Sequence, residues 1–318
     1  MPSVYYESYG CQMNAYDTEV ISSLLGSKGF SRADSPEEAD IIIVNTCSVR
    51  KNAEQRAIGR LNDLSRHGGS FLAVCGCMAQ RMGDSLFEAV PGLDMVAGTD
   101  TYLELAATLR DALETKRRTA MTAVDGEINY SLVDGGSSAD ATRYLSITRG
   151  CENYCSYCIV PYVRGKVRSK EPGIIIREAR EMISAGAKEI TLLGQNVMAY
   201  RHGDFDFTRL ARRMLDETEV RRLRFLTTHP RDLDMEIFGL MADEDRLCPH
   251  LHLPVQSGSD RLLELMRRGY SSEVYRNEIR EARRIVPGLA ITTDIIVGFP
   301  TESDEDFQRT IDIVEQCR

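Results

Sequence analysis

Short apolar segments alternate with amphipathic segments along nearly all of this 318-residue chain, and that alternation limits the possible folds most. The run Ile41–Val44 is continuously apolar, which is typical of a parallel strand buried on both faces. Strands are expected at Val4–Tyr9, Asp40–Val44, Phe71–Val74 and Asp94–Ala97, with helices at Ala15–Ser27, Ala53–Ser65, Asp84–Val90 and Tyr102–Leu113. Residues 1–122 are therefore predicted to form an α/β domain with a doubly wound parallel sheet.

A second series of the same kind follows a break in the pattern at residues 123–142, where Asp134–Asp140 has the composition of a linker. Its strands are expected at Tyr144–Thr148, Ile190–Leu193, Leu223–Thr227, His250–Pro254 and Ile291–Val297. Five such units predict that residues 143–318 form a partial (β/α) barrel of the TIM type. The last helical pattern has no stop signal, so a C-terminally truncated chain is expected.

Cysteine usage indicates metal or redox chemistry. The chain has nine cysteines, and its first residues contain neither a basic segment nor a long apolar segment typical of an export signal. A cytoplasmic protein is expected, in which a disulfide framework is excluded and cysteines bind metals or react. No apolar run is long enough for a membrane span. The net charge of −9 argues against a broad nucleic-acid surface.

The loop cysteines, Cys151, Cys155 and Cys158, place three thiols within eight residues, directly after a predicted strand. Simple electron carriers hold a four-iron cluster with four cysteines. Three would leave one iron open to a chelating cofactor, as in an open catalytic zinc site. The alternatives are three unrelated thiols or a structural zinc site, for which the nearest later ligands, His202 and Cys248, are remote in sequence.

The strand-end cysteines, Cys11, Cys47 and Cys77, each lie just past the end of a different predicted strand. Parallel strands would bring them to one edge of the sheet, where α/β domains bind ligands. This predicts a second three-cysteine cluster with its own open iron. The alternative is three buried core cysteines, although each lies in a turn with Gly, Asn or Ser. The remaining thiols, Cys75, Cys248 and Cys317, are expected to be structural or incidental.

Further polar residues follow the predicted barrel strands, where barrel enzymes carry their active sites. Four of them suit the ribose, amine and carboxylate of a cofactor: Gln195, Asn196, Gln256 and Ser257. Their alternative role is that of turn or cap residues. A basic run, Arg164, Lys166 and Arg168, follows the loop cysteines. It could hold substrate phosphates, or it could be a solvated face.

The loop cysteines, spaced C-x-x-x-C-x-x-C after the first barrel strand, resemble the radical S-adenosylmethionine (SAM) superfamily. A second cluster in an N-terminal α/β domain resembles its methylthiotransferase family. Three strings are most similar to the MiaB branch: Tyr9–Asn14, Asn45–Arg50 and His252–Asp260. The resemblance implies two 4Fe–4S clusters and S-adenosylmethionine, with the loop cysteines generating the radical and Tyr157 against the adenine. This family normally adds a C-terminal TRAM domain, expected to be missing here.

For the MiaB branch the resemblance implies replacement of the C2–H of N6-isopentenyladenosine, in the tRNA anticodon loop, by a methylthio group. The strand-end cysteines would serve sulfur donation. The implied partners are tRNA and an electron donor of the flavodoxin or ferredoxin type. The protein itself is expected to be a monomer. Relatives that modify a ribosomal-protein aspartate or threonylcarbamoyl-adenosine in tRNA remain alternatives. So does a non-enzymatic iron–sulfur or zinc protein.

Overall fold

The structure is a computed structural model, which describes residues 1–49, 51–66, 69–124 and 140–317. They form two units. The first contains the described residues up to 124 together with Ile159–Lys166, and the second contains Asp140–Cys158 and the residues from Val167 onward. Ile159–Lys166 thus packs with the unit that precedes it in sequence, although the sequence pattern placed it in the barrel. The Gly/Ser-rich part of the expected linker lies outside the described residues.

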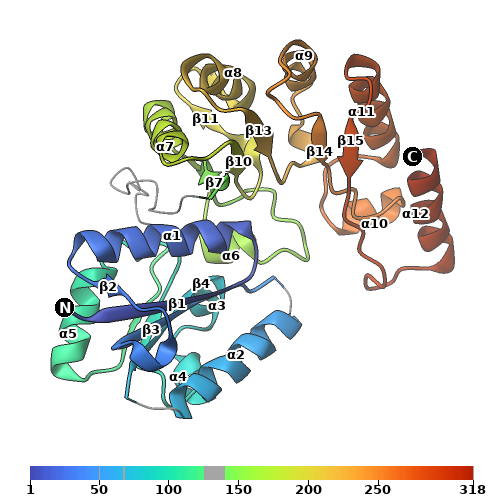
Figure 1. Ribbon diagram of the computed structural model, residues 1–318. Coiled ribbons are helices and arrows are strands. Elements are labelled where there is room, and N and C mark those ends of the chain that lie inside the picture. Colours follow the sequence, from blue (N-terminus) through green and yellow to red (C-terminus); the bar gives the residue numbers. More distant parts are fainter. Residues whose placement is uncertain (50, 67–68, 125–139, 318) are drawn as a thin grey trace. The chain divides into compact units, whose positions relative to one another are not determined.

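The first unit is built on a six-stranded sheet in which every pairing is parallel, in the order β2-β1-β3-β4-β5-β6 (Figure 1). This confirms the predicted parallel α/β domain. The strands are β1 (Ser3–Tyr9), β2 (Ser31–Arg32), β3 (Ile41–Thr46), β4 (Phe71–Gly76), β5 (Met95–Ala97) and β6 (Thr119–Met121). The helices are α1 (Gln12–Ser27), α2 (Lys51–Arg66), α3 (Cys77–Met82), α4 (Ser85–Ala89), α5 (Leu105–Thr115) and α6 (Val160–Arg164), with a 3₁₀ turn η1 (Pro36–Glu38).

Strand β3 is covered by helices on both faces of the sheet. All six of its residues are buried. Ile42 and Val44 join the apolar core that includes Leu61 of α2 and Leu86 of α4. Alternate residues of a strand point to opposite faces, so Ile41 and Ile43 face the other side, where α1 packs on β1 and β3 (Figure 1). Two helical layers therefore remove both faces of β3 from water.

The second unit contains a parallel sheet β13-β10-β7 and a parallel pair β14-β15. Backbone hydrogen bonds from Leu223 to Arg246 and from Cys248 to Leu223 continue the series between them. The barrel strands are β7 (Thr142–Ser146), β10 (Glu189–Leu193), β13 (Arg222–Phe225), β14 (His250–His252) and β15 (Ala290–Thr292). Its helices are α7 (Pro172–Ser184), α8 (Phe207–Glu217), α9 (Glu236–Asp243), α10 (Asp260–Leu265), α11 (Ser272–Ile285) and α12 (Asp304–Gln316).

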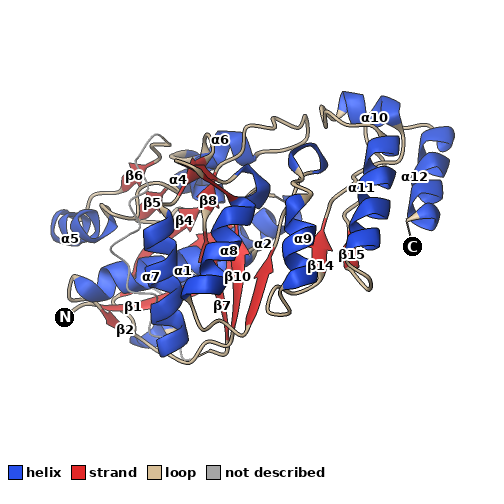
Figure 2. Ribbon diagram, turned by 90° about the horizontal axis from the view of Figure 1, so that it is seen from above, coloured by secondary structure: helices blue, strands red, loops and turns tan. Residues whose placement is uncertain are grey.

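The longer helices of this unit pack side by side in chain order, α7 on α8, α8 on α9, α9 on α11 and α11 on α12 (Figure 2). Short pieces complete it: strand pairs β8–β9 (Thr148–Arg149 with Arg168–Ser169) and β11–β12 (Arg201–His202 with Phe205–Asp206), and 3₁₀ turns η3 (Val197–Ala199) and η4 (Pro230–Asp232). The strand expected at Ile291–Val297 ends at Thr292, because its ladder partner β14 ends at His252, which pairs with Thr292. None of the described helices combines the length and apolarity needed to cross a membrane.

Candidate active site

The three strand-end cysteines follow adjacent strands that are in register. Tyr9 of β1 pairs with Thr46 of β3, and Thr46 pairs with Gly76 of β4. Cys47 and Cys77 are the next residues after this row, and Cys11 is one residue further along its own strand. The strand order β1-β3-β4 therefore brings together three thiols that are up to 66 residues apart in sequence.

Two glycines let the strand ends approach closely. Gly10 has φ +150°, and a Cβ placed on it would lie 2.6 Å from the Cβ of Cys47. Gly76 has φ +93°, and a Cβ there would collide with the side chain of Asn45. Both positions combine a left-handed backbone with lack of space, so both require glycine. Each precedes a strand-end cysteine.

Two buried asparagines fix the turn that carries Cys11. Asn14 Nδ2 donates to Asn45 Oδ1 at 3.0 Å and to the Thr46 carbonyl at 3.1 Å. In return, Asn45 Nδ2 donates to the Asn14 carbonyl at 3.0 Å, and the Cys11 thiol donates to Asn14 Oδ1 at 3.3 Å. Asn14 and Asn45 thus link the end of β3 to the first turn of α1. Their hydrogen bonds hold Cys11 next to Cys47.

The strand-end thiols shift one another's pKa values. A hydrogen bond from Cys47, with backbone N–H groups of Asn14 and Met13, lowers the pKa of Cys11 to about 6. The same hydrogen bond and burial raise the pKa of Cys47. Burial raises the pKa of Cys77, and the guanidinium of Arg164 opposes that rise. Three such sulfurs form a donor set of the chemistry that iron–sulfur clusters require.

Arg164 is a buried cation beside the strand-end cysteines. Its side chain is 3% exposed and forms an ion pair with the fully buried Asp17, Nη2 to Oδ2 at 2.9 Å. Its Nε donates to Cys77 Sγ at 3.2 Å. Arg164 therefore departs from the expectation of a basic run that faces a substrate. In the same run Lys166 is exposed and Arg168 is half-buried, so phosphate contacts by these two remain predictions.

The loop cysteines follow β8 in a loop that hydrogen bonds fix around Cys155–Cys158. The Cys158 N–H donates to the Cys155 carbonyl at 2.9 Å. Ser156 donates through its N–H to Met266 and through its hydroxyl to the Leu265 carbonyl, at 3.0 and 2.9 Å. Burial raises the pKa of Cys151, and the thiols of Cys155 and Cys158 add to that rise. The three loop thiols are thus close to one another, as their spacing predicted.

Arg268 and His229 flank Cys155. The guanidinium of Arg268 is buried and donates to Cys155 Sγ at 3.5 Å and to the Tyr157 hydroxyl at 3.4 Å. Burial, helped by Arg268, lowers the pKa of His229 to about 3. Its Nδ1 accepts the N–H of Arg231 at 3.2 Å, so this network assigns the ring proton to Nε2, 4.0 Å from Cys155 Sγ. His229 is a neutral, oriented neighbour of the loop.

Asp232 joins the loop to the predicted cofactor residues after β10. Its Oδ2 accepts from Asn196 Nδ2 at 2.6 Å and from Asn153 Nδ2, in the cysteine loop, at 3.1 Å. The Oδ1 of Asn196 is buried with no hydrogen-bond partner among the described residues. A buried polar atom without a partner is unfavourable, so this oxygen is available to a bound donor. Gln195 Oε1 accepts the Gly150 N–H at 2.6 Å.

The other predicted cofactor residues differ in their environments. Tyr157 is 38% exposed, and its contact with an adenine stays a prediction. Gln256 adopts φ +67° and lies in a bridge between the loops after β14 and β15. Ser257 is fully buried, and its hydroxyl accepts the N–H of Ser259 at 3.1 Å. The structure therefore gives Ser257 the turn role that was its alternative.

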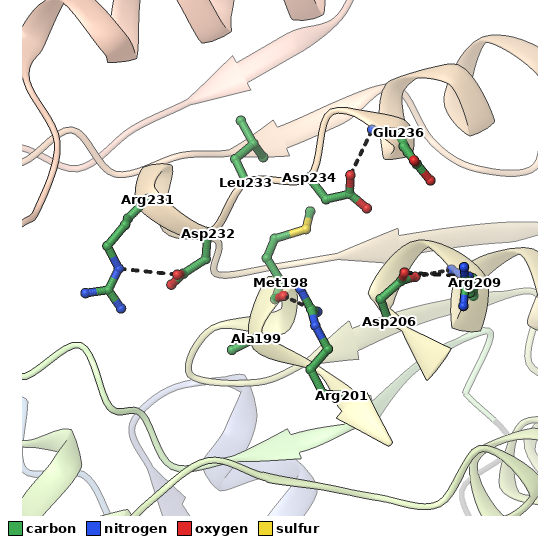
Figure 3. Close-up of a pocket in the computed structure, with 10 residues that line it drawn as sticks. All are labelled: Met198, Ala199, Arg201, Asp206, Arg209, Arg231, Asp232, Leu233, Asp234 and Glu236. Carbon is green, nitrogen blue, oxygen red and sulfur yellow. Dashed lines mark hydrogen bonds and ion pairs between the residues drawn. The ribbon is translucent and has the colours of Figure 1, made fainter. Parts of the chain in front are cut away.

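A polar pocket opens beside Asp232. It measures about 620 Å³, and arginines and carboxylates alternate around its lining (Figure 3). Its lining residues are Met198, Ala199, Arg201, Asp206, Arg209, Arg231, Asp232, Leu233, Asp234 and Glu236. Arg231 pairs with the adjacent Asp232 on one side of it, and Arg209 pairs with Asp206 on another. It follows β10 and β13, on the side of the barrel where sequence placed the active site.

Non-glycine residues with left-handed backbone also gather at these loops. Tyr154 in the cysteine loop has φ 45°, Thr227 after β13 has φ 65°, and Thr301 after β15 has φ 70°. Such conformations cost free energy and persist where surrounding contacts impose them, often at functional sites. The described residues contain no group of three or more Cys, His, Asp or Glu side chains that surrounds a single metal ion. In a cluster each thiolate binds a different iron, so the two cysteine sets need not converge on one point.

Comparison with known proteins agrees with this division. Residues 145–314 match the Radical SAM superfamily, and residues 3–98 match the family described as "Uncharacterized protein family UPF0004". A tRNA-2-methylthio-N(6)-dimethylallyladenosine synthase of Syntrophotalea carbinolica is 42% identical over 327 residues, covering 100% of this chain and 75% of that protein. The enzyme of the same name from Geobacter sulfurreducens is 43% identical, covering 99% of this chain and 72% of that protein. The chain belongs to the radical SAM methylthiotransferases.

Solved radical SAM enzymes share the fold of this methylthiotransferase. The cobalamin-dependent enzyme OxsB matches with a TM-score of 0.70 at 13% identity, covering 99% of this chain and 52% of its own. The methyltransferase TsrM of Kitasatospora setae matches with a TM-score of 0.70 at 14% identity, covering 100% and 71%. The radical SAM domain implies a 4Fe–4S cluster and S-adenosylmethionine, and membership of an enzyme family rules out the non-enzymatic alternative. Five residues that complete the site escaped sequence reasoning: the buried Asn14, Asp17, Asn45 and Arg268, and the half-buried Asp232.

Proposed function

We propose that this methylthiotransferase converts N6-isopentenyladenosine in the tRNA anticodon loop to its 2-methylthio derivative. The observation that carries the substrate assignment is 42–43% identity, over essentially the whole chain, to two relatives that bear the name of that synthase. A base in a single-stranded loop can be splayed out and reached by an enzyme. The partners of this reaction would be tRNA and a flavodoxin- or ferredoxin-type electron donor.

The loop cysteines would hold the 4Fe–4S cluster that binds S-adenosylmethionine. The chemistry that the bound pair supplies is one-electron cleavage of the sulfonium to a 5′-deoxyadenosyl radical. The fit rests on three thiols in a tethered loop and on the Asn196 amide oxygen, which is buried and open to a donor. Asp232 orients Asn196 and the cysteine loop through one carboxylate, and Arg268 and His229 hold Cys155 from the other side.

The strand-end cysteines would hold a second cluster, used for sulfur donation. Three mutually interacting thiols at the carboxyl edge of a parallel sheet support this assignment. Asn14 and Asn45 fix the geometry of this set, and Gly10 and Gly76 allow the close approach. A set of three leaves one iron without a protein ligand, where sulfur could be bound.

Mass spectrometry of tRNA tests the substrate. Cells that lack the full-length gene should lose 2-methylthio-N6-isopentenyladenosine and accumulate N6-isopentenyladenosine, and the gene should restore the product. Loss of the methylthio derivative of threonylcarbamoyl-adenosine would assign the other tRNA substrate. An unchanged tRNA pool, together with loss of methylthio-aspartate from a ribosomal protein, would contradict a tRNA substrate altogether.

A further inference from the structure

We infer that Arg164 is a positioning residue for the strand-end cluster, orienting Cys77 and raising the reduction potential of the group that this set holds. The inference rests on the proposed second cluster. Arg164 lies only six residues after Cys158, in the sequence that codes for the barrel, yet helix α6 packs in the N-terminal unit against α3, the helix that begins at Cys77.

The contacts of Arg164 are those of a built site. Asp17 of α1 binds Nη2 at 2.9 Å and so fixes the plane of the guanidinium, whose Nε then donates to Cys77 Sγ at 3.2 Å. The exposures of the two side chains in the ion pair are 3% and 0%. The Tyr102 hydroxyl is 3.5 Å from the same Asp17 oxygen. An arginine fork can serve both partners at once, which a point charge on a flexible stem cannot.

Helix α6 itself is locked in place. Val163 is buried, and its carbonyl accepts a hydrogen bond at 2.7 Å from the hydroxyl of Thr99, which is also fully buried. Gly165 ends the helix with φ +70°. These contacts fix the position of α6, and with it the position of Arg164 relative to Cys77. The N–H···S contact therefore follows from the fold.

The physical effect follows from charge and hydrogen bonding. A cluster gains negative charge on reduction, and an adjacent guanidinium with an N–H···S bond stabilises the more negative state. Hydrogen bonds to sulfur and local net charge are principal determinants of cluster potential. Arg164 should therefore raise the potential of the strand-end cluster and leave that of the loop cluster unchanged. Arg268, which donates to Cys155, is the matched arginine at the loop set.

The test uses the full chain with all three loop cysteines replaced by alanine, so that bound iron reports the strand-end cluster only. After anaerobic reconstitution, iron and sulfide per chain are measured, and the cluster is titrated against redox dyes with dithionite and followed by electron paramagnetic resonance. Arg164→Met should lower the midpoint potential. It should also weaken iron retention against a chelator by about 10–100-fold, the usual effect of mutating a residue that contacts a metal ligand. Arg268→Met in the same background should change neither.

Arg164→Lys and Arg164→Gln keep the test decisive if Arg164→Met does not fold. Lysine retains the charge and should restore part of the potential, while glutamine retains only a donor and should restore less. A fully loaded cluster with the parental potential in all folded Arg164 variants would overturn the inference and leave the proposed function intact. A parent that binds no iron would overturn both, because no strand-end cluster would exist.

Discussion

The two cysteine sets bring three thiols together in different ways. The loop cysteines lie within eight residues and need one tethered loop. The strand-end cysteines come from three strand ends and need the register of β1, β3 and β4 before they meet. A buried arginine donates to a sulfur of each set, Arg268 to Cys155 and Arg164 to Cys77. The loop set is encoded locally, whereas the strand-end set depends on the tertiary fold.

Replacing cysteines should separate the two sets most strongly. Cys155→Ala should reduce bound iron by about four atoms per chain and abolish cleavage of S-adenosylmethionine. Cys47→Ala should cause the same loss of iron but keep cleavage to 5′-deoxyadenosine, while methylthiolated product falls to background. Iron analysis and chromatography of both products check this. Loss of cleavage in a folded Cys47→Ala variant would contradict the division of roles.

Removing the brace of the strand-end set should cost stability. Asn45→Ala leaves the buried Asn14 amide without its partner, and such a loss costs about 1–3 kcal/mol. The free energy of unfolding and the iron of the strand-end set should both decrease. Asn153→Ala is the matched change at the loop set. The partners that it leaves, the half-buried Asp232 and the exposed Arg231, can bind water instead, so less than about 1 kcal/mol is expected. Equal losses measured by denaturant titration would contradict the comparison.

Adding a single methyl group at a strand end should show how tightly that set is packed. Gly10→Ala forces a Cβ to within 2.6 Å of Cys47 Cβ, and overpacking of this kind costs about 1–3 kcal/mol. Gly26→Ala, in α1, meets no atom within 4 Å and should stabilise the chain by about 0.4–1 kcal/mol. Thermal unfolding of both variants distinguishes them, and a stabilised Gly10→Ala variant would show that the strand ends have room.

The smallest effect expected is a difference in thiol reactivity in the cluster-free chain. Hydrogen bonds lower the pKa of Cys11 to about 6, whereas burial raises that of Cys151. Because the thiolate is the nucleophile, alkylation of Cys11 by iodoacetamide should rise through pH 6 and level off above it. Alkylation of Cys151 should still be rising at pH 9. Cys47→Ala removes the main donor and should move the Cys11 profile upward, as followed by mass spectrometry.

Sequence reasoning found what patterns record directly. The alternation of strands and helices predicted the parallel sheet, and spacing identified the loop cysteines. It also predicted that Cys11, Cys47 and Cys77 would share one edge, because each follows a strand. It did not find β2 or β8, each two residues long, since so short a strand has no period. Asp17, on α1, and Arg268, in the loop after α10, were invisible for another reason: charged residues usually face water, and only the tertiary packing buries these two.

Helix α6 has a consequence for how this protein can be divided. The nucleotides that encode residues 1–124 do not encode a whole folding unit, since Val160–Arg164 completes it from downstream. A fragment cut at the linker would leave Asp17 as a buried carboxylate without its guanidinium. Exchange of halves between related genes at that linker would separate Arg164 from the Asp17 and Cys77 that it contacts. Inheritance of the two halves is therefore tied together by five residues.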